Sequence, residues 1–206
     1  MEKEFVEAVE RGIACLVADF QGQPKRFWNE RDIHWYLFHH LKQDPVFLCD
    51  YGTEPIRAEF PTRRVYQETE DAKPARGQYD LVILDPTSAT SHPAGELPPW
   101  ASWDKCLPHL VVLVATEVKT CVDRTTDIPD KADWDIEKLT DAQNAVRHAY
   151  LLNFVQLDFS RRQMLDFYRD LREYLTEKAR QWPKLRILCV PHDKGVQPDP
   201  EQNWIH

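Results

Sequence analysis

The sequence predicts an α/β fold in which a central mixed β-sheet is flanked by helices. Residues 110–119 are apolar on both faces, as expected of a central strand that is covered from two sides. Hairpin-like strands come early in the chain, and strands alternate with amphipathic helices later. That order favours a mixed sheet with helices packed on both of its faces.

Two helices are predicted at the start of the chain. Residues 2–20 place apolar side chains near one face, and a glycine and a proline then break the pattern. A second helix begins near Asn29, a good N-cap, and its apolar residues recur at helical spacing. It is expected to end at Asp44, because a residue that precedes proline disfavours the α conformation.

Strands and an insertion follow. Residues 55–67 are expected to form a strand pair or one strand that is interrupted at Pro61. Residues 77–86, GQYDLVILDP, predict a strand because a β-rich apolar run lies between a glycine and a proline. Residues 86–109 contain five prolines and little periodicity, so they predict a loop or insertion before the strand at 110–119.

The remaining elements are predicted from their hydrophobic period. After an acidic, turn-like segment, the pattern predicts a helix at 134–149, a strand at 150–159, a helix at 160–181 and a strand at 185–190. The tail after Pro191 is expected to be irregular.

Length and composition indicate one globular domain. The 206 residues are 42% hydrophobic and 29% charged, which is enough to bury a core and argues against disorder. We expect a single domain over residues 1–206, with residues 1–24 as an N-terminal helix and residues 86–109 as a proline-rich insertion.

Charge and cysteine content indicate the compartment and limit the partners. No apolar run approaches the ~18 residues that span a bilayer, and five cysteines without framework spacing fit a reducing compartment. We therefore expect a cytoplasmic protein without membrane contact. The formal net charge of −8 counts against a general nucleic-acid coat, but not against an enzyme whose carboxylates hold metal ions.

Three acids and a lysine are attached to core elements where a polar group should be costly. Glu30 is in the first turn of the second helix and borders its inward face, and Asp80 opens the apolar run DLVIL. Glu117 and Lys119 end the next strand in ATEVKT, where residues i and i+2 point to the same face. If the two strands are adjacent and antiparallel, Asp80 lies beside Glu117.

These residue types suit metal-assisted hydrolysis. Three carboxylates around one point form a hard-oxygen site for Mg²⁺ or Mn²⁺. Such a metal polarises a phosphoryl oxygen and lowers the pKa of its bound water. A lysine beside the carboxylates can position or deprotonate that water.

The pattern resembles the restriction-endonuclease-like superfamily of PD-(D/E)xK nucleases. The matching residues are Glu30 on a helix before the sheet, Asp80 in QYDLVIL, and Glu117, Val118 and Lys119 in TEVKT. The helix that begins DWDIEKL also resembles the segment that follows the E-x-K strand, with Lys138 in its first turns. The likeness spans about residues 28–160.

The resemblance implies a sheet core of α-β-β-β-α-β order and a nuclease that hydrolyses phosphodiester bonds in DNA with Mg²⁺ or Mn²⁺. Asp80 and Glu117 would ligate the metal. The carbonyl of Val118 and the carboxylate of Glu30 would assist them, and Lys119 would serve the attacking water. A homodimer or a partner subunit would be compatible with this activity.

Other interpretations of the same residues stay open. Glu117 and Lys119 alone are also typical of an exposed ion pair at a strand end. Glu30 is equally typical of an acid that stabilises a helix N-terminus. The same fold could also serve as a non-catalytic subunit that binds a protein partner through the insertion at 86–109 or its tryptophans.

Two further groups of residues have alternative interpretations. Two Cys-x-Pro-His motifs could close a tetrahedral zinc site, although a cysteine in a strand more often packs as an apolar residue. The motifs run from Cys106 to His109 and from Cys189 to His192. The basic pairs could contact phosphates, but in an acidic chain most are expected to be solvated or salt-bridged: Lys25-Arg26, Arg63-Arg64 and Arg161-Arg162.

Overall fold

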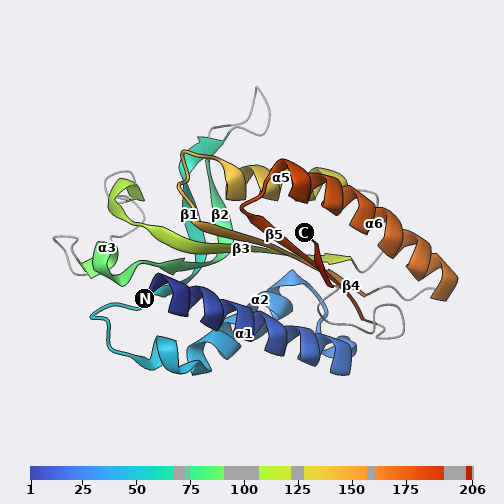
Figure 1. The fold of residues 1–206 in the computed structure, drawn as a ribbon, viewed down its shortest axis with the longest axis horizontal. Coiled ribbons are helices and arrows are strands. Elements are labelled where there is room, and N and C mark those ends of the chain that lie inside the picture. The colour runs from blue at the N-terminus through green and yellow to red at the C-terminus, as the bar shows by residue number, and fades with distance from the viewer. Residues whose placement is uncertain are drawn as a thin grey trace.

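We describe the protein from a computed structural model. The structure describes residues 1–66, 73, 75–90, 107–121, 128–156, 161–192 and 203–205, of which 128–131, 161 and 164 are described by their backbone alone. The prediction of an α/β fold is confirmed, because a six-stranded mixed sheet is flanked by helices (Figure 1).

The sheet has the strand order β1-β2-β3-β4-β5-β6. Its strands are β1 (Ile56–Tyr66), β2 (Ala75–Leu84), β3 (Val112–Cys121), β4 (His148–Val155), β5 (Leu185–Pro191) and β6 (Trp204–Ile205). β1, β2 and β3 are antiparallel neighbours, whereas β3, β4 and β5 are parallel. β6 pairs with β5 in the antiparallel direction. The predicted mixed sheet is therefore confirmed.

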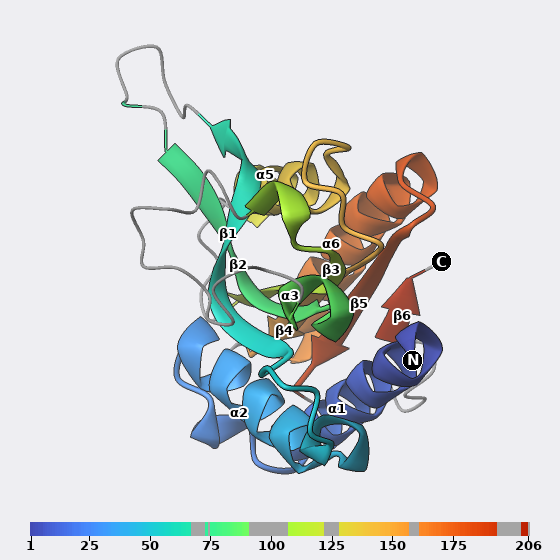
Figure 2. The same ribbon diagram turned by 90° about the vertical axis from the view of Figure 1, so that its left-hand side faces the viewer.

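Helices cover both faces of the sheet (Figure 1; Figure 2). One face carries α1 (Glu2–Gly22) and α2 (Glu30–Gln43), and the other carries α5 (Ile128–Thr140) and α6 (Arg161–Gln181). Short helical segments are η1 (Pro24–Arg26), η2 (Pro45–Leu48), α3 (Pro86–Thr90) and η4 (Leu107–His109). A hydrophobic cluster lies on each face, and β3 contributes Val114 to one and Ala115 to the other. The prediction that this strand is buried on both faces is confirmed.

The N-terminus of α2 confirms the predicted cap. The side chain of Asn29 accepts the N–H of Asp32 at 3.1 Å, and the carboxylate of Asp32 accepts the N–H of Asn29 at 3.3 Å. This reciprocal pair is a capping box, which satisfies two backbone donors that the helix leaves open. The cap fixes Glu30 in the first turn, while Ile33 and Leu37 bury the inward face.

The segment predicted at 55–67 as a strand pair or an interrupted strand is one strand, β1. Pro61 lies opposite Gln78 of β2, and the pairing register shifts between Pro61 and Val65. Among the described strands β1 pairs with β2 alone, which makes it an edge strand of the described sheet, and an edge strand tolerates a residue that lacks an N–H. The expected break is present only as this irregularity.

The helix predicted at 134–149 is wrong at both ends, because α5 already begins at Ile128, in the segment that was expected to be turn-like. α5 ends at Thr140, and His148 already begins β4. In the connecting segment Ala145 adopts a positive φ of 53°. Asn144 is buried and donates to a carbonyl of the last turn of α5 at 2.8 Å. These local bonds end the helix although the apolar spacing continues.

The later elements agree with the sequence predictions more closely. β4, α6 and β5 confirm the strand, helix and strand expected after residue 150. The tail after Pro191 is not wholly irregular, because β6 pairs with β5. Within the insertion at 86–109, α3 and η4 are described, whereas Trp100, Trp103 and Cys106 lie outside the described residues.

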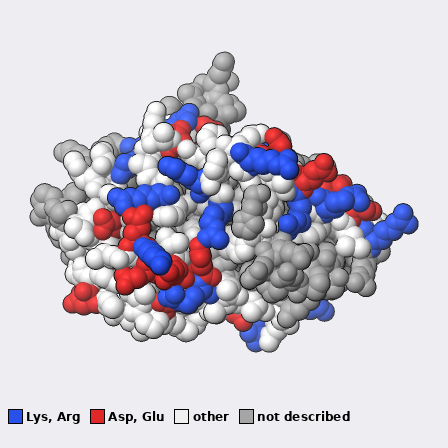
Figure 3. Space-filling model, viewed as in Figure 1, with Lys and Arg blue, Asp and Glu red and all other residues white. Residues whose placement is uncertain are grey.

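The surface and the helices give two further observations. Within the described part of the chain, no helix combines the length and the apolar character that crossing a membrane requires. Acidic and basic side chains are intermingled on the face shown in Figure 3, so charge of one sign does not dominate that face.

Candidate active site

The sheet divides at the point where Asp80 and Glu117 lie. β2 pairs with β3 only from Leu81 onwards, opposite Val112–Thr116. Before Leu81, β2 continues beside β1 alone, and beyond Thr116, β3 continues beside β4 (Figure 2). The predicted antiparallel pairing of the two strands is confirmed, and it brings Asp80 next to Glu117.

Asp80 occupies the gap between the separating strands. Its Oδ2 atom accepts the N–H of Val118 at 2.6 Å. A strand N–H that has lost its neighbouring strand still needs an acceptor, and here a carboxylate takes the place of a β2 carbonyl. The bond fixes the carboxylate of Asp80 against the backbone of the Glu117-Val118-Lys119 motif.

Ion pairs connect the other charged residues of the site into one chain. Lys138 Nζ lies 2.7 Å from Glu117 Oε1 and 2.8 Å from Asp135 Oδ1. Lys119 Nζ lies 2.9 Å from Asp135 Oδ2 and 3.7 Å from Glu30 Oε2. We call these five residues the ion-pair network. Glu117, Asp135 and Lys138 are buried, with exposed fractions of 1%, 3% and 6%.

The protonation states of Glu117, Lys119 and Lys138 follow from their burial and from the charges around them. Burial raises the pKa of Glu117 well above its ordinary value, and the negative charges of Asp135 and Asp80 raise it further. Burial alone would lower the pKa values of Lys138 and Lys119, but the surrounding carboxylates outweigh it and raise both. Both lysines are therefore ammonium ions at neutral pH, and Glu117 is the group whose ionisation is disfavoured.

Lys138 also attaches α5 to β2. Its Nζ donates to the carbonyl of Gln78 at 3.0 Å, and the hydroxyl of Tyr79 donates to the Lys138 carbonyl at 3.2 Å. Gly77 leaves room for the lysine stem, because a Cβ atom there would lie 3.0 Å from Lys138 Cδ and 3.3 Å from Thr62 Cγ2. This glycine was predicted to precede the strand, but it lies within β2, where it permits the close approach of the helix.

Glu30 joins the site from α2. In addition to its contact with Lys119, its Oε1 atom accepts the N–H of Thr120 at 3.4 Å. Its side chain is 47% exposed, so this end of the ion-pair network is open to solvent. The predicted residues Glu30, Asp80, Glu117 and Lys119 are thus gathered, with Val118, where β2 and β3 separate.

Two neighbouring residues were not predicted from the sequence. Asp135 holds both lysines, and its signal was its position three residues before Lys138, on the same face of the helix. His34 follows Glu30 by one helical turn. Its half-buried ring has an Nε2 atom without a hydrogen-bond partner among the described residues. Burial lowers the pKa of His34, and the negative charge of Asp80 opposes that effect.

The residue types of the site suit a divalent cation. Four carboxylates face two ammonium groups, so the site has an excess of negative charge and supplies hard oxygen donors. Burial is the main cause of the raised pKa of Glu117, and the charges of Asp135 and Asp80 add to it while Lys138 opposes it. In the described part of the chain, however, no three His, Cys, Asp or Glu side chains converge closely enough to enclose a metal. The lysines lie between the acids instead.

The motif around Cys189 gives no support to a zinc site. The Cys189 thiol is free and buried in the hydrophobic cluster beneath α6, where burial raises its pKa. His109 is exposed at the end of η4. The thiol therefore packs as a small apolar side chain, which was the alternative interpretation of this cysteine.

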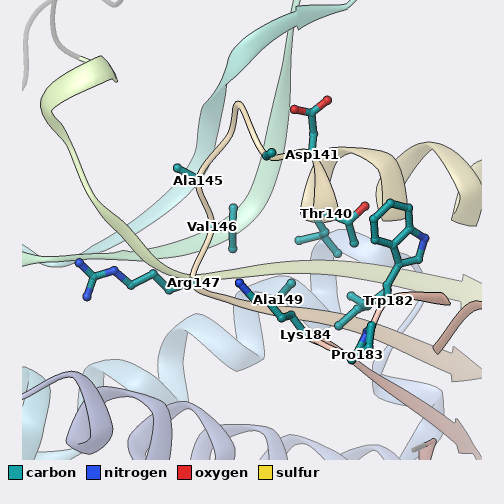
Figure 4. A pocket seen from close by; sticks show the side chains of 12 residues that line it. Thr140, Asp141, Ala145, Val146, Arg147, Ala149, Trp182, Pro183 and Lys184 are labelled. Carbon is teal, nitrogen blue, oxygen red and sulfur yellow. The ribbon is translucent and has the colours of Figure 1, made fainter. Parts of the chain in front are cut away.

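The cavity shown in Figure 4 lies apart from the ion-pair network. Its volume is about 510 Å³, and it is formed by the segment after α5 and the turn between α6 and β5. Among its charged lining residues, Asp141 pairs with Arg64 and Arg147 pairs with Glu2. Lys184 also lines the cavity, and none of the five residues of the ion-pair network does, so the cavity is separate from the candidate site.

Comparisons of the chain with protein-family models, with curated proteins and with solved structures gave no match.

Proposed function

We propose that the protein is a divalent-metal-dependent nuclease of the PD-(D/E)xK type that hydrolyses phosphodiester bonds in DNA. One observation carries the proposal. The carboxylate of Asp80 is bound to the N–H of Val118, in the middle of the Glu117-x-Lys119 motif, at the point where two core strands separate. A buried acid, a second acid and a lysine at such a fork are costly in a core that only needs to be stable.

The element order supports the finer form of the proposal. Apart from the short segments η2, α3 and η4, the described elements α2, β1, β2, β3, α5 and β4 follow one another along the chain, which agrees with the α-β-β-β-α-β core that the resemblance implies. Asp80 lies on β2, and the Glu117-Val118-Lys119 motif lies on β3. The helix α5, which carries Asp135 and Lys138, follows β3. The order agrees with the family pattern, but order alone does not establish an activity.

The oxygen donors for the metal would come from Asp80, Glu117 and the carbonyl of Val118, with Glu30 at the open side. Mg²⁺ or Mn²⁺ bound there supplies a positive charge for the phosphoryl oxygens and a more acidic water. Glu117 would enter this role as a carboxylate, because the charge of a nearby cation favours the ionised form and opposes the effect of burial on its pKa.

Lys119 would position the attacking water and the scissile phosphate. Its pKa is raised by the acids around it, so its ammonium group donates hydrogen bonds and does not accept a proton. Asp135 holds the ammonium at 2.9 Å and limits the directions in which it can point. The lysine therefore acts by orientation and charge, which leaves the proton of the water to another acceptor.

A second candidate function is a non-catalytic subunit in which the ion-pair network is structural. The observation that favours it is that Glu117 and Asp135 each have an ammonium group within 3 Å, so the buried charges are paired without a metal. Replacing such a network by apolar residues is often neutral or stabilising. The subunit hypothesis thus predicts no saturable binding of divalent cations at this site.

Cleavage assays decide between the two candidates. We expect plasmid and linear DNA to be cut by the wild-type protein with Mg²⁺ or Mn²⁺. Lys119→Ala should reduce the rate by at least about 10²-fold, the usual effect of losing one positioned hydrogen-bond donor in an active site. Asp80→Asn, which keeps an oxygen for the Val118 N–H, should also be inactive because it loses a charged ligand. Lys178→Ala is the matched control, since this lysine pairs with Asp133 on the exposed side of α5.

The proposal fails if the folded wild-type protein cuts neither DNA nor RNA with either metal. Calorimetric titration with Mn²⁺ adds an independent measurement. Saturable binding that is lost in Asp80→Asn supports the metal site, whereas binding that is absent in the wild-type protein favours the subunit.

A further inference from the structure

Two large aromatic side chains are exposed beside the candidate active site. Trp28 is 80% exposed and Trp35 is 65% exposed. Trp28 precedes the cap of α2 and Trp35 lies on its second turn, where its ring stacks on Phe38 with ring centroids 5.7 Å apart. Tryptophans at this level of exposure contribute little to a core, and they mark surfaces that meet a partner.

Basic side chains lie in the same stretch of chain. Lys25 and Arg26 end η1, and both are exposed without an acidic partner among the residues that the structure describes. Arg31 is four residues before Trp35, on the same side of the helix, and its side chain is 85% exposed. Its one acidic contact, to Glu59, is long at 3.8 Å and open to solvent, so it is weak.

The aromatic and basic side chains adjoin the ion-pair network through Glu30. This acid lies between Trp28 and Arg31 in the chain, and its carboxylate reaches Lys119 and the end of β3. Helix α2 contacts β1, β2 and β3, which are the strands that meet at the fork. A ligand bound along residues 25–35 would therefore lie on the segment that carries Glu30 into the site.

We propose that residues 25–35 form a platform for an unpaired nucleic-acid strand, which makes single strands or frayed ends the substrate class. The inference rests on the proposed nuclease function. Bases would stack on the rings of Trp28 and Trp35, and phosphates would contact Lys25, Arg26 and Arg31. Stacking on exposed aromatic rings requires bases that are free of a complementary strand, and cationic side chains that track the backbone accompany it.

The charge of the platform favours a nucleic acid over a protein partner. The chain has a net charge of −8, yet residues 25–35 carry three cations against two acids. Of these acids, Asp32 is held in the cap of α2 and Glu30 turns to Lys119, so the cations are the charges that the platform offers to a ligand. A duplex would need a wider basic surface, because phosphate neutralisation supplies most of its affinity. A local cluster of three cations with two exposed rings matches a single strand better.

Binding without cleavage tests the platform. Fluorescence anisotropy in EDTA, with a labelled oligothymidylate and with the same strand in a duplex, should give tighter binding of the single strand. Trp28→Ala and Trp35→Ala should each weaken single-strand binding about 5-fold or more, as loss of one stacked base does. Trp182→Ala is the matched control, since Trp182 is 43% exposed beside the cavity in Figure 4 and should not change the affinity.

A salt titration supplies the second measurement. The double variant Lys25→Ala/Arg26→Ala should lower the slope of log affinity against log salt by about 0.7 for each phosphate that the protein no longer neutralises. Thermal unfolding of each variant checks that the fold is retained, which is expected because all four side chains are exposed.

Each result has a definite meaning. Unchanged single-strand affinity in both tryptophan variants, or a preference for the duplex, overturns the platform. The platform is also overturned if a tryptophan variant differs from the wild-type protein in molecular mass in solution while its single-strand affinity is unchanged. The rings then belong to an interface between protein chains. The wild-type protein could also bind the single strand in a tryptophan-dependent way and cut nothing with Mg²⁺ or Mn²⁺. That result supports the platform and contradicts only the nuclease proposal.

Discussion

Glu117 is the residue of the site with the least favourable environment. Its side chain is buried, the acids Asp135 and Asp80 lie nearby, and a single ammonium group contacts it directly. Its raised pKa means that the folded protein holds a proton on this carboxyl more tightly than the unfolded chain does. The free energy of unfolding should therefore depend on pH through the ionisation of Glu117.

Without a metal, Glu117 should make the fold less stable as the pH rises above its ordinary pKa of 4.5. A carboxyl whose folded pKa is raised contributes most while it is protonated, and the contribution is lost as it ionises. Glu117→Gln cannot ionise, so the free energy of unfolding of this variant, relative to wild type, should increase from acidic to neutral pH. Urea denaturation in EDTA measures the difference at each pH. A difference that stays constant or decreases would contradict the interpretation.

The main site residues could be predicted because they lie at strand ends, but the ion-pair network that holds them could not. Asp80, Glu117 and Lys119 interrupt apolar runs, and a period of two places the last pair on one face. Asp135 does not interrupt such a run, and its role depends on how α5 docks against β3. A contact between distant elements of this kind leaves no local period in the sequence.

At the scale of elements, α5 has two polar sides with different surroundings. Lys138 faces the fork and pairs with buried acids, whereas Asp133 pairs with Lys178 of α6 near solvent. The same residue types therefore stabilise the protein by different amounts. Removing one member of a buried pair leaves an uncompensated charge, but an exposed pair contributes little.

Lys138→Ala should lower the free energy of unfolding by about 3–5 kcal/mol, the usual effect of breaking a buried ion pair. Lys178→Ala should lower it by about 0–1 kcal/mol, because its partner is partly exposed. Chemical denaturation of both variants at neutral pH gives the two values. Equal losses would mean that Glu117 and Asp135 are not held in a dry interior.

Element boundaries were predicted well where a local signal was strong and poorly where a tertiary contact decided them. The capping residue Asn29 fixes the start of α2 within the sequence itself. The end of α5 is different, because Asn144 and its long-range bonds form the turn and β4 is ordered by its neighbours. Likewise, Pro61 suggested a break that the edge position of β1 makes unnecessary.

At the scale of the whole molecule, the site lies where the sheet loses continuity. Two hydrophobic clusters hold the helices on opposite faces, and β3 belongs to both of them. The antiparallel β1–β2 unit and the parallel β3–β5 unit separate at Asp80 and Glu117. This separation leaves the Val118 N–H and the carboxylates of Asp80 and Glu117 at the fork without disturbing either cluster. The alternation of strands and helices predicted the layers, but the point of separation depends on register.

A cation bound at this fork should stabilise the whole fold. The ligand-binding residues come from both units of the sheet, so binding requires the folded arrangement and draws free energy from it by mass action. With Mn²⁺ at about 100 times its dissociation constant, the free energy of unfolding should rise by about 2.7 kcal/mol over its value in EDTA. Asp80→Asn should abolish most of this gain, because it removes a charged ligand while the bond from the Val118 N–H can remain. Urea denaturation of both proteins, with and without the metal, measures the gain. An equal gain in the variant would place the cation elsewhere on the acidic surface, and the excess negative charge at the fork would then need another explanation.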